Sequence, residues 1–286
     1  MLDLGAQYTL LKRCFCQYCS RSTVLKSYVL YYLELHLRKC IMTVKDRVAI
    51  VTGGSRGIGE GISRLFVEHG AKVAIWDLLD EGQAVADELT AQGADVIFQN
   101  INITDRAAVE AGVAEVVERF GTVDILINNA GITKDKSFAK MTEEQWDAVM
   151  SVNLKGIFHC SQAVMPIMKE KRYGRIISAS STSGLRGNFG QANYAATKAG
   201  VVGMMKTLAV ELGPHGITAN AIAPGYVKTA MTDAIPDNIK QMALMTIPVG
   251  FLAEPKDLAI GYLFLASEES RFVNGICLPI DGGFSR

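Results

Sequence analysis

Residues 47–60 read RVAIVTGGSRGIGE, and this stretch decides the fold. Residues 47–52 form a short apolar, β-branched run, as in a strand that is buried on both faces of a parallel sheet. A glycine-rich turn (53–59) follows, and an apolar-periodic helix then extends to about residue 69. Glycines permit the tight turn and let backbone N–H groups approach a pyrophosphate at the helix N-terminus. A strand, a glycine turn and a helix in this order predict a dinucleotide site.

The next apolar run, residues 72–76, ends in Asp77. An acid at the end of the second strand can accept both hydroxyls of an adenosine ribose, and it would repel a 2′-phosphate. The alternative is a solvated loop acid without a role. Asp77 therefore favours NAD(H), while Arg56 in the glycine turn could still meet the 2′-phosphate of NADP(H).

Strands and helices then alternate to the end of the chain, and no linker or internal repeat follows Met42. This pattern predicts an α/β fold: one Rossmann-type, doubly wound parallel sheet of about seven strands with helices on both faces. The further strands are expected at 95–100, 124–127, 175–179, 217–222 and near 275–278; the helices are expected at 81–92, 105–120, 143–171 with a bend near Pro166, from about 192 through 212, and 255–266.

Candidate chemistry lies in residues 178–198, SASSTSGLRGNFGQANYAATK. Tyr194 and Lys198 are four residues apart, so they share one helix face. A nearby ammonium favours the phenolate, and we expect it to lower the pKa of Tyr194 toward the range of efficient proton transfer. Ser181 could hold a carbonyl oxygen beside the tyrosine hydroxyl. A Tyr-x-x-x-Lys pattern often occurs by chance, so the pair indicates catalysis only together with the predicted dinucleotide site.

Composition narrows the function classes. The 286 residues carry 29 Lys+Arg and 29 Asp+Glu, so no net basic field favours nucleic acid. No apolar stretch reaches the roughly 18 residues of a membrane span, so no membrane partner is expected. Cys160 and Cys277 are far apart, which fits reduced thiols in a cytoplasm.

Residues 1–41 differ from the rest, with four of the six cysteines and only two acids. Cys14, Cys16 and Cys19 have metal-ligand character, but no second pair completes a site, so no metal is expected. A transit peptide is a second interpretation, and an apolar helix over 24–37 a third. The favoured interpretation is that the natural start is Met42, that residues 1–41 are not part of the fold, and that residues 42–286 form the NAD(P)-binding domain.

From residue 44 onward the chain resembles short-chain dehydrogenases/reductases. The motifs are Thr52-Gly53-x-x-x-Gly57-x-Gly59, Asn128-Asn129-Ala130-Gly131, Asn153, Ser181, Tyr194-x-x-x-Lys198, Pro224-Gly225 and Asp281-Gly282-Gly283. Among that superfamily it is most similar to 3-oxoacyl-[acyl-carrier-protein] and acetoacetyl-CoA reductases, through residues 131–156, 187–200 and 216–232.

The resemblance implies a catalytic tetrad. Tyr194 is the acid–base residue, Ser181 orients the carbonyl, Lys198 holds the nicotinamide ribose, and Asn153 holds a water that links Lys198 to solvent. Ser178, Ser180 and Ser183 lack the family spacing to Tyr194. The implied cofactor contacts are Gly53, Ser55, Arg56, Gly57, Ile58, Gly59, Asp77, Asn102, Ile103, Asn129, Ala130, Gly131, Tyr194, Lys198, Pro224, Gly225, Val227 and Thr229.

The implied activity is hydride transfer between NAD(P)H and a 3-oxoacyl thioester, with substrate or carrier contacts at Arg172, Gln191 and Met231. Two departures stand out. Such reductases usually favour NADPH and lack an acid like Asp77, and His215 replaces the second of two arginines that grip an acyl-carrier protein.

Two other functions compete. One is an NAD-dependent dehydrogenase of a small secondary alcohol, sugar or steroid, and the other is a non-catalytic NAD(P)-binding scaffold. The resemblance also implies a D2 homotetramer, in which the helices 143–171 and 192–212 pair across a two-fold axis and the C-terminal segment makes a second interface.

Overall fold

The structure is a computed structural model that describes residues 42–233, 241 and 244–285. The chain divides into two units, Met1–Ile41 and Met42–Arg286, and the first lies outside the described residues. The prediction that residues 1–41 are not part of the fold therefore stays a prediction, as do the interpretations of their cysteines.

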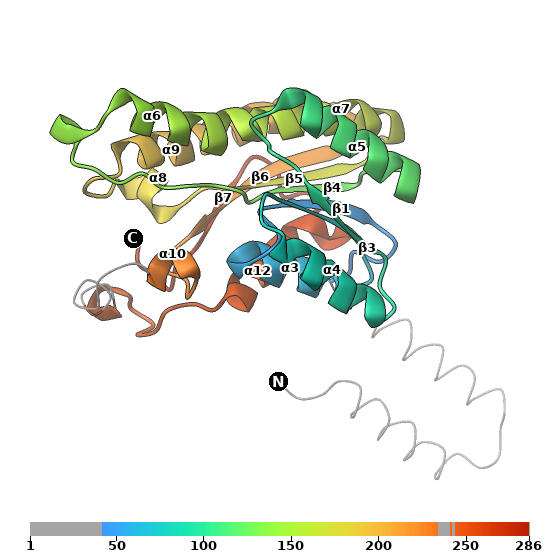
Figure 1. The fold of residues 1–286 in the computed structure, drawn as a ribbon, viewed down its shortest axis with the longest axis horizontal. Coiled ribbons are helices and arrows are strands. Elements are labelled where there is room, and N and C mark those ends of the chain that lie inside the picture. The colour runs from blue at the N-terminus through green and yellow to red at the C-terminus, as the bar shows by residue number, and fades with distance from the viewer. Residues whose placement is uncertain (1–41, 234–240, 242–243, 286) are drawn as a thin grey trace, which may run out of the picture. The chain divides into compact units, whose positions relative to one another are not determined.

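A seven-stranded sheet organises the second unit (Figure 1). Every neighbouring pair is parallel, and the strand order is β3-β2-β1-β4-β5-β6-β7. The strands are β1 (Val48–Thr52), β2 (Lys72–Asp77), β3 (Val96–Asn100), β4 (Ile125–Asn128), β5 (Gly174–Ala179), β6 (Ile217–Pro224) and β7 (Cys277–Ile280). The doubly wound parallel sheet expected from the alternating pattern is confirmed, with β7 starting two residues later than expected.

Helices cover both faces of the sheet (Figure 1). One apolar layer holds α3 (Gly57–Glu68), α4 (Glu81–Ala91) and α12 (Pro255–Ala266); the other holds α5 (Arg106–Phe120), α7 (Ile157–Lys171) and α9 (Ala192–Leu212). Phe66 and Tyr262 are fully buried in the first layer, and Met168 and Met205 in the second. Each layer covers one face of the sheet and removes apolar side chains from water. Burial of apolar surface is the main favourable contribution to the free energy of folding. The shorter elements are η1 (Phe138–Lys140), α6 (Glu143–Met150), η2 (Ser151–Gly156), α8 (Thr182–Arg186), η3 (Gly213–His215), α10 (Ala230–Asp233) and η4 (Glu268–Ser270).

The expected helix over 143–171 forms as three consecutive pieces, α6, η2 and α7. The middle piece is a π-helix, and the interruption therefore lies at Asn153 rather than near Pro166, which sits inside α7. Asn153 uses its side-chain amide on the backbone of Ile132, with Oδ1 accepting from N at 2.8 Å and Nδ2 donating to O at 2.9 Å. Single π turns of this kind are frequent at functional sites.

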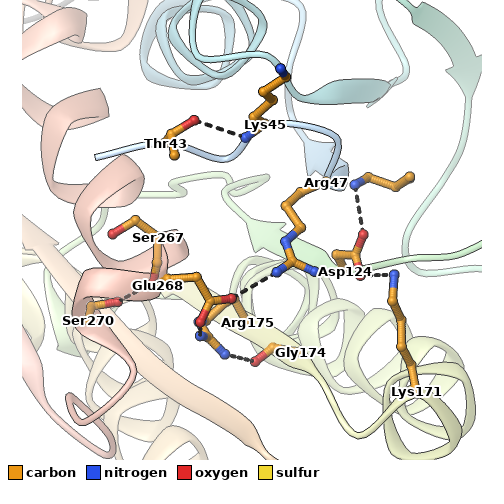
Figure 2. A network of polar contacts seen from close by, with 11 residues as sticks. Thr43, Lys45, Arg47, Asp124, Lys171, Gly174, Arg175, Ser267, Glu268 and Ser270 are labelled. Atoms are coloured by element: carbon orange, nitrogen blue, oxygen red, sulfur yellow. Dashed lines mark hydrogen bonds and ion pairs between the residues drawn. The ribbon is translucent and has the colours of Figure 1, made fainter. Parts of the chain in front are cut away.

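A polar network closes the amino-terminal edge of the sheet (Figure 2). Asp124 is fully buried; its Oδ2 accepts from Val48 N at 3.1 Å, and Lys171 Nζ lies 2.5 Å from its Oδ1. Arg47 reaches Glu268 at 2.9 Å, and Arg175 reaches the same carboxylate at 3.5 Å. Cations therefore surround the buried carboxylate, and residues at the starts of β1, β4 and β5 meet residues of α7 and η4 there.

Candidate active site

The carboxyl ends of the strands meet at the opposite edge, and most of the predicted site residues follow these ends. Strands β2 and β3 are added on one side of β1, and strands β4 to β7 are added on its other side. The direction of strand addition therefore reverses between β1 and β4. Ligands of open α/β sheets bind in the crevice outside such a switch point. The glycine turn follows β1, Asp77 ends β2, residues 129–131 follow β4, and Ser181 follows β5.

The glycine turn fits a pyrophosphate. Gly53 and Gly57 have φ of 63° and 57°, which glycine adopts without strain. A Cβ at Gly59 would lie 2.0 Å from Gly53 O, so the packing of helix against turn excludes a side chain there. Arg56, the N-cap of α3, makes no side-chain cap hydrogen bond. The N–H groups of the first turn thus remain open to an anion, while Ile58 packs against the core.

Asp77 is fixed beside this turn. Its Oδ2 accepts from Ser55 N at 3.1 Å, and its Oδ1 accepts from Leu78 N at 2.8 Å and Leu79 N at 3.2 Å. A carboxylate offers about four acceptor positions. The three backbone bonds therefore hold the charge in place and leave one acceptor position for a further donor such as a ribose hydroxyl.

The Asn-Asn-Ala-Gly segment locks the glycine turn from the other side. Asn129 Nδ2 donates to Thr52 O at 3.2 Å and to Gly53 O at 3.0 Å, and Thr52 Oγ1 accepts from Asn129 N and Ala130 N. Asn128 Nδ2 instead binds two buried serine hydroxyls, so its role is in the sheet. Thr52 was absent from the predicted site, although it is the hub of this lock.

The four residues of the expected tetrad converge. Ser181 is the N-cap of α8, and its Oγ accepts from Ser183 N at 3.1 Å and hydrogen-bonds to the Tyr194 hydroxyl. Lys198 Nζ lies 5.5 Å from the centroid of the Tyr194 ring. A Cβ at Gly131 would lie 3.3 Å from Asn153 Oδ1 and 3.6 Å from Lys198 Nζ. Gly131 therefore leaves room where the lysine and asparagine approach the loop after β4.

The environment of Tyr194 differs from the expectation. Burial raises the pKa of its hydroxyl, the hydrogen bond with Ser181 lowers it, and the charge of Asp135 raises it, so the net direction is upward. Burial lowers the pKa of Lys198 to about 8. The expectation that the ammonium brings the tyrosine pKa below its ordinary value is wrong for this arrangement, because burial is the largest influence on the phenol and raises its pKa.

The loop after β6 reaches the glycine turn. A Cβ at Gly57 would lie 3.2 Å from Thr229 Cγ2. Val227 is buried, and Gly225 is so close to Asp281 that a Cβ would lie 2.8 Å from its backbone. Pro224 ends β6, so these four predicted cofactor contacts form one flank of the crevice.

Asn102 and Ile103 follow β3 but use their groups internally. Asn102 Oδ1 accepts from Thr104 N at 3.0 Å, and Ile103 O lies 3.0 Å from His159 Nδ1. The Ile103 side chain is buried against Gly156. The carbonyl of Ile103 and the amide oxygen of Asn102 already have partners, so cofactor contacts there would fall to other atoms.

The three substrate or carrier candidates do not come together. Gln191 lies at the site, directly before α9. Arg172 follows α7 at the far edge of the sheet, with φ of 52° and Nη2 donating to Pro214 O at 2.9 Å. Met231 lies in α10, and its side chain is outside the described residues.

Two site residues were missed. Asn193 Nδ2 donates to Lys134 O and Gln145 O, both at 3.1 Å, and its Oδ1 accepts from Tyr194 N at 2.7 Å. Asp135 Oδ2 accepts from Gln191 Nε2 at 2.8 Å. Their partners come from distant loops, so neither residue has a local signal; the recurrence of short polar side chains on both loops is the only hint.

Some classes of site find no support in the part of the chain that the structure describes. It contains no group of three or more His, Cys, Asp or Glu side chains that could hold a metal ion. None of its helices is long and apolar enough to cross a membrane. The glycine cradle, the uncapped start of α3 and the fixed Asp77 together fit a dinucleotide.

Comparisons with known proteins agree with this geometry. A family profile described as enoyl-(acyl carrier protein) reductase matches residues 53–285. A 3-oxoacyl-[acyl-carrier-protein] reductase FabG from Thermotoga maritima is 43% identical over 243 residues, which cover 85% of this chain and 99% of the relative. Its counterpart from Staphylococcus aureus is 44% identical over 237 residues, covering 82% of this chain and 96% of the relative.

Solved structures show the same fold. The crystal structure of levodione reductase matches with a TM-score of 0.79 and 37% identity, covering 84% of this chain and 98% of that one. The crystal structure of gox2181 matches with a TM-score of 0.83 and 36% identity, covering 85% and 97%.

Proposed function

Because the chain belongs to the short-chain dehydrogenase/reductase family, we propose that it reduces the carbonyl of 3-oxoacyl thioesters with a nicotinamide cofactor. The observation that carries the proposal is the hydrogen-bonded pair of Ser181 and Tyr194 beside the buried Lys198, next to a cradle that fits a dinucleotide. Relatives that match nearly over their whole length bear the name of this activity.

The chain's own residues suffice for the proton part of the reaction. A bound nicotinamide cofactor supplies the hydride. The Ser181 hydroxyl accepts from Ser183 N, so its own proton can point toward a substrate carbonyl oxygen. Tyr194 donates its proton to that oxygen, since burial keeps the phenol neutral near pH 7. The cation of Lys198 lies close enough to stabilise the tyrosinate that results.

For the cofactor, the proposal is a preference for NAD(H). The fixed Asp77 carboxylate supports it, because a 2′-phosphate beside this carboxylate would be a like-charge contact. Arg56 supports the alternative of NADP(H): its side chain is exposed, and no hydrogen bond or ion pair is found for it among the described residues.

An acyl-carrier protein is proposed as the partner that delivers the thioester. Arg172 and His215 lie close together, since Arg172 Nη2 binds the carbonyl of Pro214. A single arginine beside a histidine is a weaker acidic-partner site than two arginines. A free coenzyme A thioester is therefore kept as a substrate in the test.

The second candidate function is an NAD-dependent dehydrogenase of a small secondary alcohol, sugar or steroid. Asp77 favours it, and so does the likeness to a solved levodione reductase.

A homotetramer and a cytoplasmic location complete the proposal. Large apolar side chains that are exposed in the single chain support the assembly: Phe158 on α7, Val210 on α9, and Phe272 and Ile276 before β7.

The experiment that tests the proposal is a panel of carbonyl substrates with NADH and with NADPH. The panel contains acetoacetyl-CoA, a 3-oxoacyl-carrier-protein substrate, and small cyclic ketones. The expected result is the highest kcat/KM on a 3-oxoacyl thioester. A preference for a cyclic ketone would select the second candidate, and cofactor binding with no turnover on any carbonyl would select the scaffold.

A further inference from the structure

Two loops that are distant in sequence meet beside the segment that carries Tyr194. One comprises residues 132–137, after β4, and the other comprises residues 187–191, directly before α9. Lys136 N donates to Gly190 O at 2.8 Å, and Gln191 Nε2 donates to Asp135 Oδ2 at 2.8 Å. The two loops are therefore joined by a main-chain bond and a side-chain bond that lie next to each other.

The other end of the Gln191 amide is linked to Ser181 through hydrogen bonds of Ser183. Its Oε1 accepts from Ser183 Oγ at 2.9 Å and from Asn188 Nδ2 at 3.0 Å. Ser183 N in turn donates to Ser181 Oγ at 3.1 Å. A carboxylate only accepts hydrogen bonds, so Asp135 requires the nitrogen of the Gln191 amide on its side and the oxygen on the side of Ser183. Asp135 thus fixes the orientation of the amide that holds the Ser181 segment.

Asp135 also acts on Tyr194 through space. Burial is the main cause that raises the pKa of Tyr194, and the negative charge of Asp135 raises it further. The other titratable groups that face this tyrosine are Lys198 on its own helix and Tyr262 on α12. Lys134 and Lys136 flank Asp135, and all three residues are exposed. The charge of Asp135 is therefore partly screened by salt.

We infer that Asp135 is a positioning residue for the proposed reduction: through Gln191 it fixes the segment that carries Ser181, and it places a negative charge near the acid–base site. The inference rests on the proposed function. It gives this exposed acid a role that the motifs of the chain do not assign, and it extends the pH range over which the tyrosine can donate a proton.

The charge is tested with Asp135→Asn, whose Oδ1 can still accept from Gln191. Reduction is lost as pH rises, because Tyr194 and Lys198 lose their protons. Removal of a nearby negative charge lowers their pKa, so the basic limb of the kcat/KM profile should move to lower pH by roughly 0.3–1 unit. Asp135→Glu should restore the limb. Asp147→Asn removes an exposed charge on α6 and should leave the limb in place.

The positioning is tested with Gln191→Met, which keeps the shape and removes the hydrogen bonds. We expect kcat to fall roughly tenfold or more from misplacement of Ser181. The basic limb should stay near that of the unchanged protein, since Asp135 keeps its charge. An unchanged kcat in this variant would overturn the positioning role.

A profile of Asp135→Asn that superimposes on that of the unchanged protein would overturn the role of the charge. Thermal melting shows whether this variant folds. Where it does not, the salt dependence of the unchanged protein decides: the limb should move to lower pH as ionic strength rises, and a salt-independent limb contradicts the inference. Absence of any carbonyl reduction by the unchanged protein would refute the proposed function instead, so the two failures are distinct.

Discussion

Lys198 Nζ donates a hydrogen bond of 2.6 Å to the main-chain oxygen of Ala179. Ala179 ends β5, two residues before Ser181, so the strand end that carries the serine also holds the lysine. The ammonium is almost fully buried, and among the described residues its hydrogen-bond acceptor is this one neutral oxygen. Its burial is thus only partly compensated, which is why the pKa of Lys198 falls to about 8.

The first prediction concerns the pH dependence of activity. We expect kcat/KM for carbonyl reduction to fall as pH rises through about 8, because Lys198 then loses the charge that stabilises the tyrosinate. Lys198→Arg keeps a cation at all accessible pH values, so its lower activity should lack this limb. A wild-type profile that stays flat to pH 10 contradicts the assignment.

The same titration has the opposite effect on stability. The pKa of Lys198 is lower in the folded chain than its ordinary value of 10.5, so the unfolded chain binds more protons between pH 8 and 10.5. The contribution of this group to the free energy of unfolding therefore rises with pH in that window. Denaturant titrations give the free energy of unfolding of wild type and of Lys198→Met at several pH values in the window. The difference between the two proteins should change with pH, and a difference that is constant across the window would mean that the lysine stays charged.

The second prediction concerns Tyr194→Phe. The ring stays, and the proton donor and its hydrogen bond to Ser181 are lost. Turnover should fall by roughly 10²–10⁴, as is typical of lost acid–base catalysis. Cofactor affinity, measured by fluorescence titration, should be retained. Near-normal turnover would remove Tyr194 from the mechanism.

The third prediction concerns the cofactor. The ratio of kcat/KM for NADH to that for NADPH should favour NADH, and Asp77→Asn should shift the ratio toward NADPH by at least about tenfold, because a like-charge contact disappears. The variant also loses the bond from Ser55 N, which affects both cofactors alike. Asp80→Asn, at an exposed acid nearby, is the matched control. A wild-type preference for NADPH would show that Arg56 dominates.

The fourth prediction concerns assembly. Val210 on α9 is 77% exposed, although it is large and apolar, and Phe272 is 100% exposed. Val210→Arg should convert a tetramer into smaller species in sedimentation velocity, because a desolvated charge would lie in the paired-helix interface. Ala114→Arg, on the exposed side of α5, should leave the assembly intact. A wild-type monomer at micromolar concentration contradicts the tetramer.

The fifth prediction concerns residues 1–41. A chain that starts at Met42 should keep its activity and its Tm, because the first strand, the glycine turn and every predicted site residue lie after that position in the sequence. The opposing case is an apolar helix over 24–37 docked on the domain, which would contribute about 1.5–3 kcal/mol per buried large side chain. A Tm lower by several degrees, or loss of the oligomer, would establish that case.

The sequence predicted the elements whose signals are local. The apolar runs predicted the strands, and the glycines of residues 53–59 predicted the turn, because both follow from backbone sterics and burial. The family spacing to Tyr194 selected Ser181 over the neighbouring serines. The structure shows that two of these have other partners: Ser178 accepts from Asn128, and Ser180 donates to Lys198 O.

What the sequence did not predict depends on tertiary contacts. The π turn at Asn153 needs the backbone of Ile132, which is far away in the chain. The pKa of Tyr194 is set by how deeply the fold buries the ring, and spacing to Lys198 does not report that depth. Asp135 is an ordinary loop acid until Gln191 is brought to it.

The network at the amino-terminal edge has a consequence for synthesis of the chain. Arg47 bonds Glu268 across 221 residues of sequence, while Asp124, Lys171 and Arg175 emerge in between. During translation, the buried carboxylate can recruit its cations early, but the contact that joins β1 and β5 to η4 waits until almost the whole domain has left the ribosome. Long-range contacts of this kind form late and slow the final step of folding. The nascent domain therefore lacks the Glu268 contacts of this edge until η4 has been synthesised.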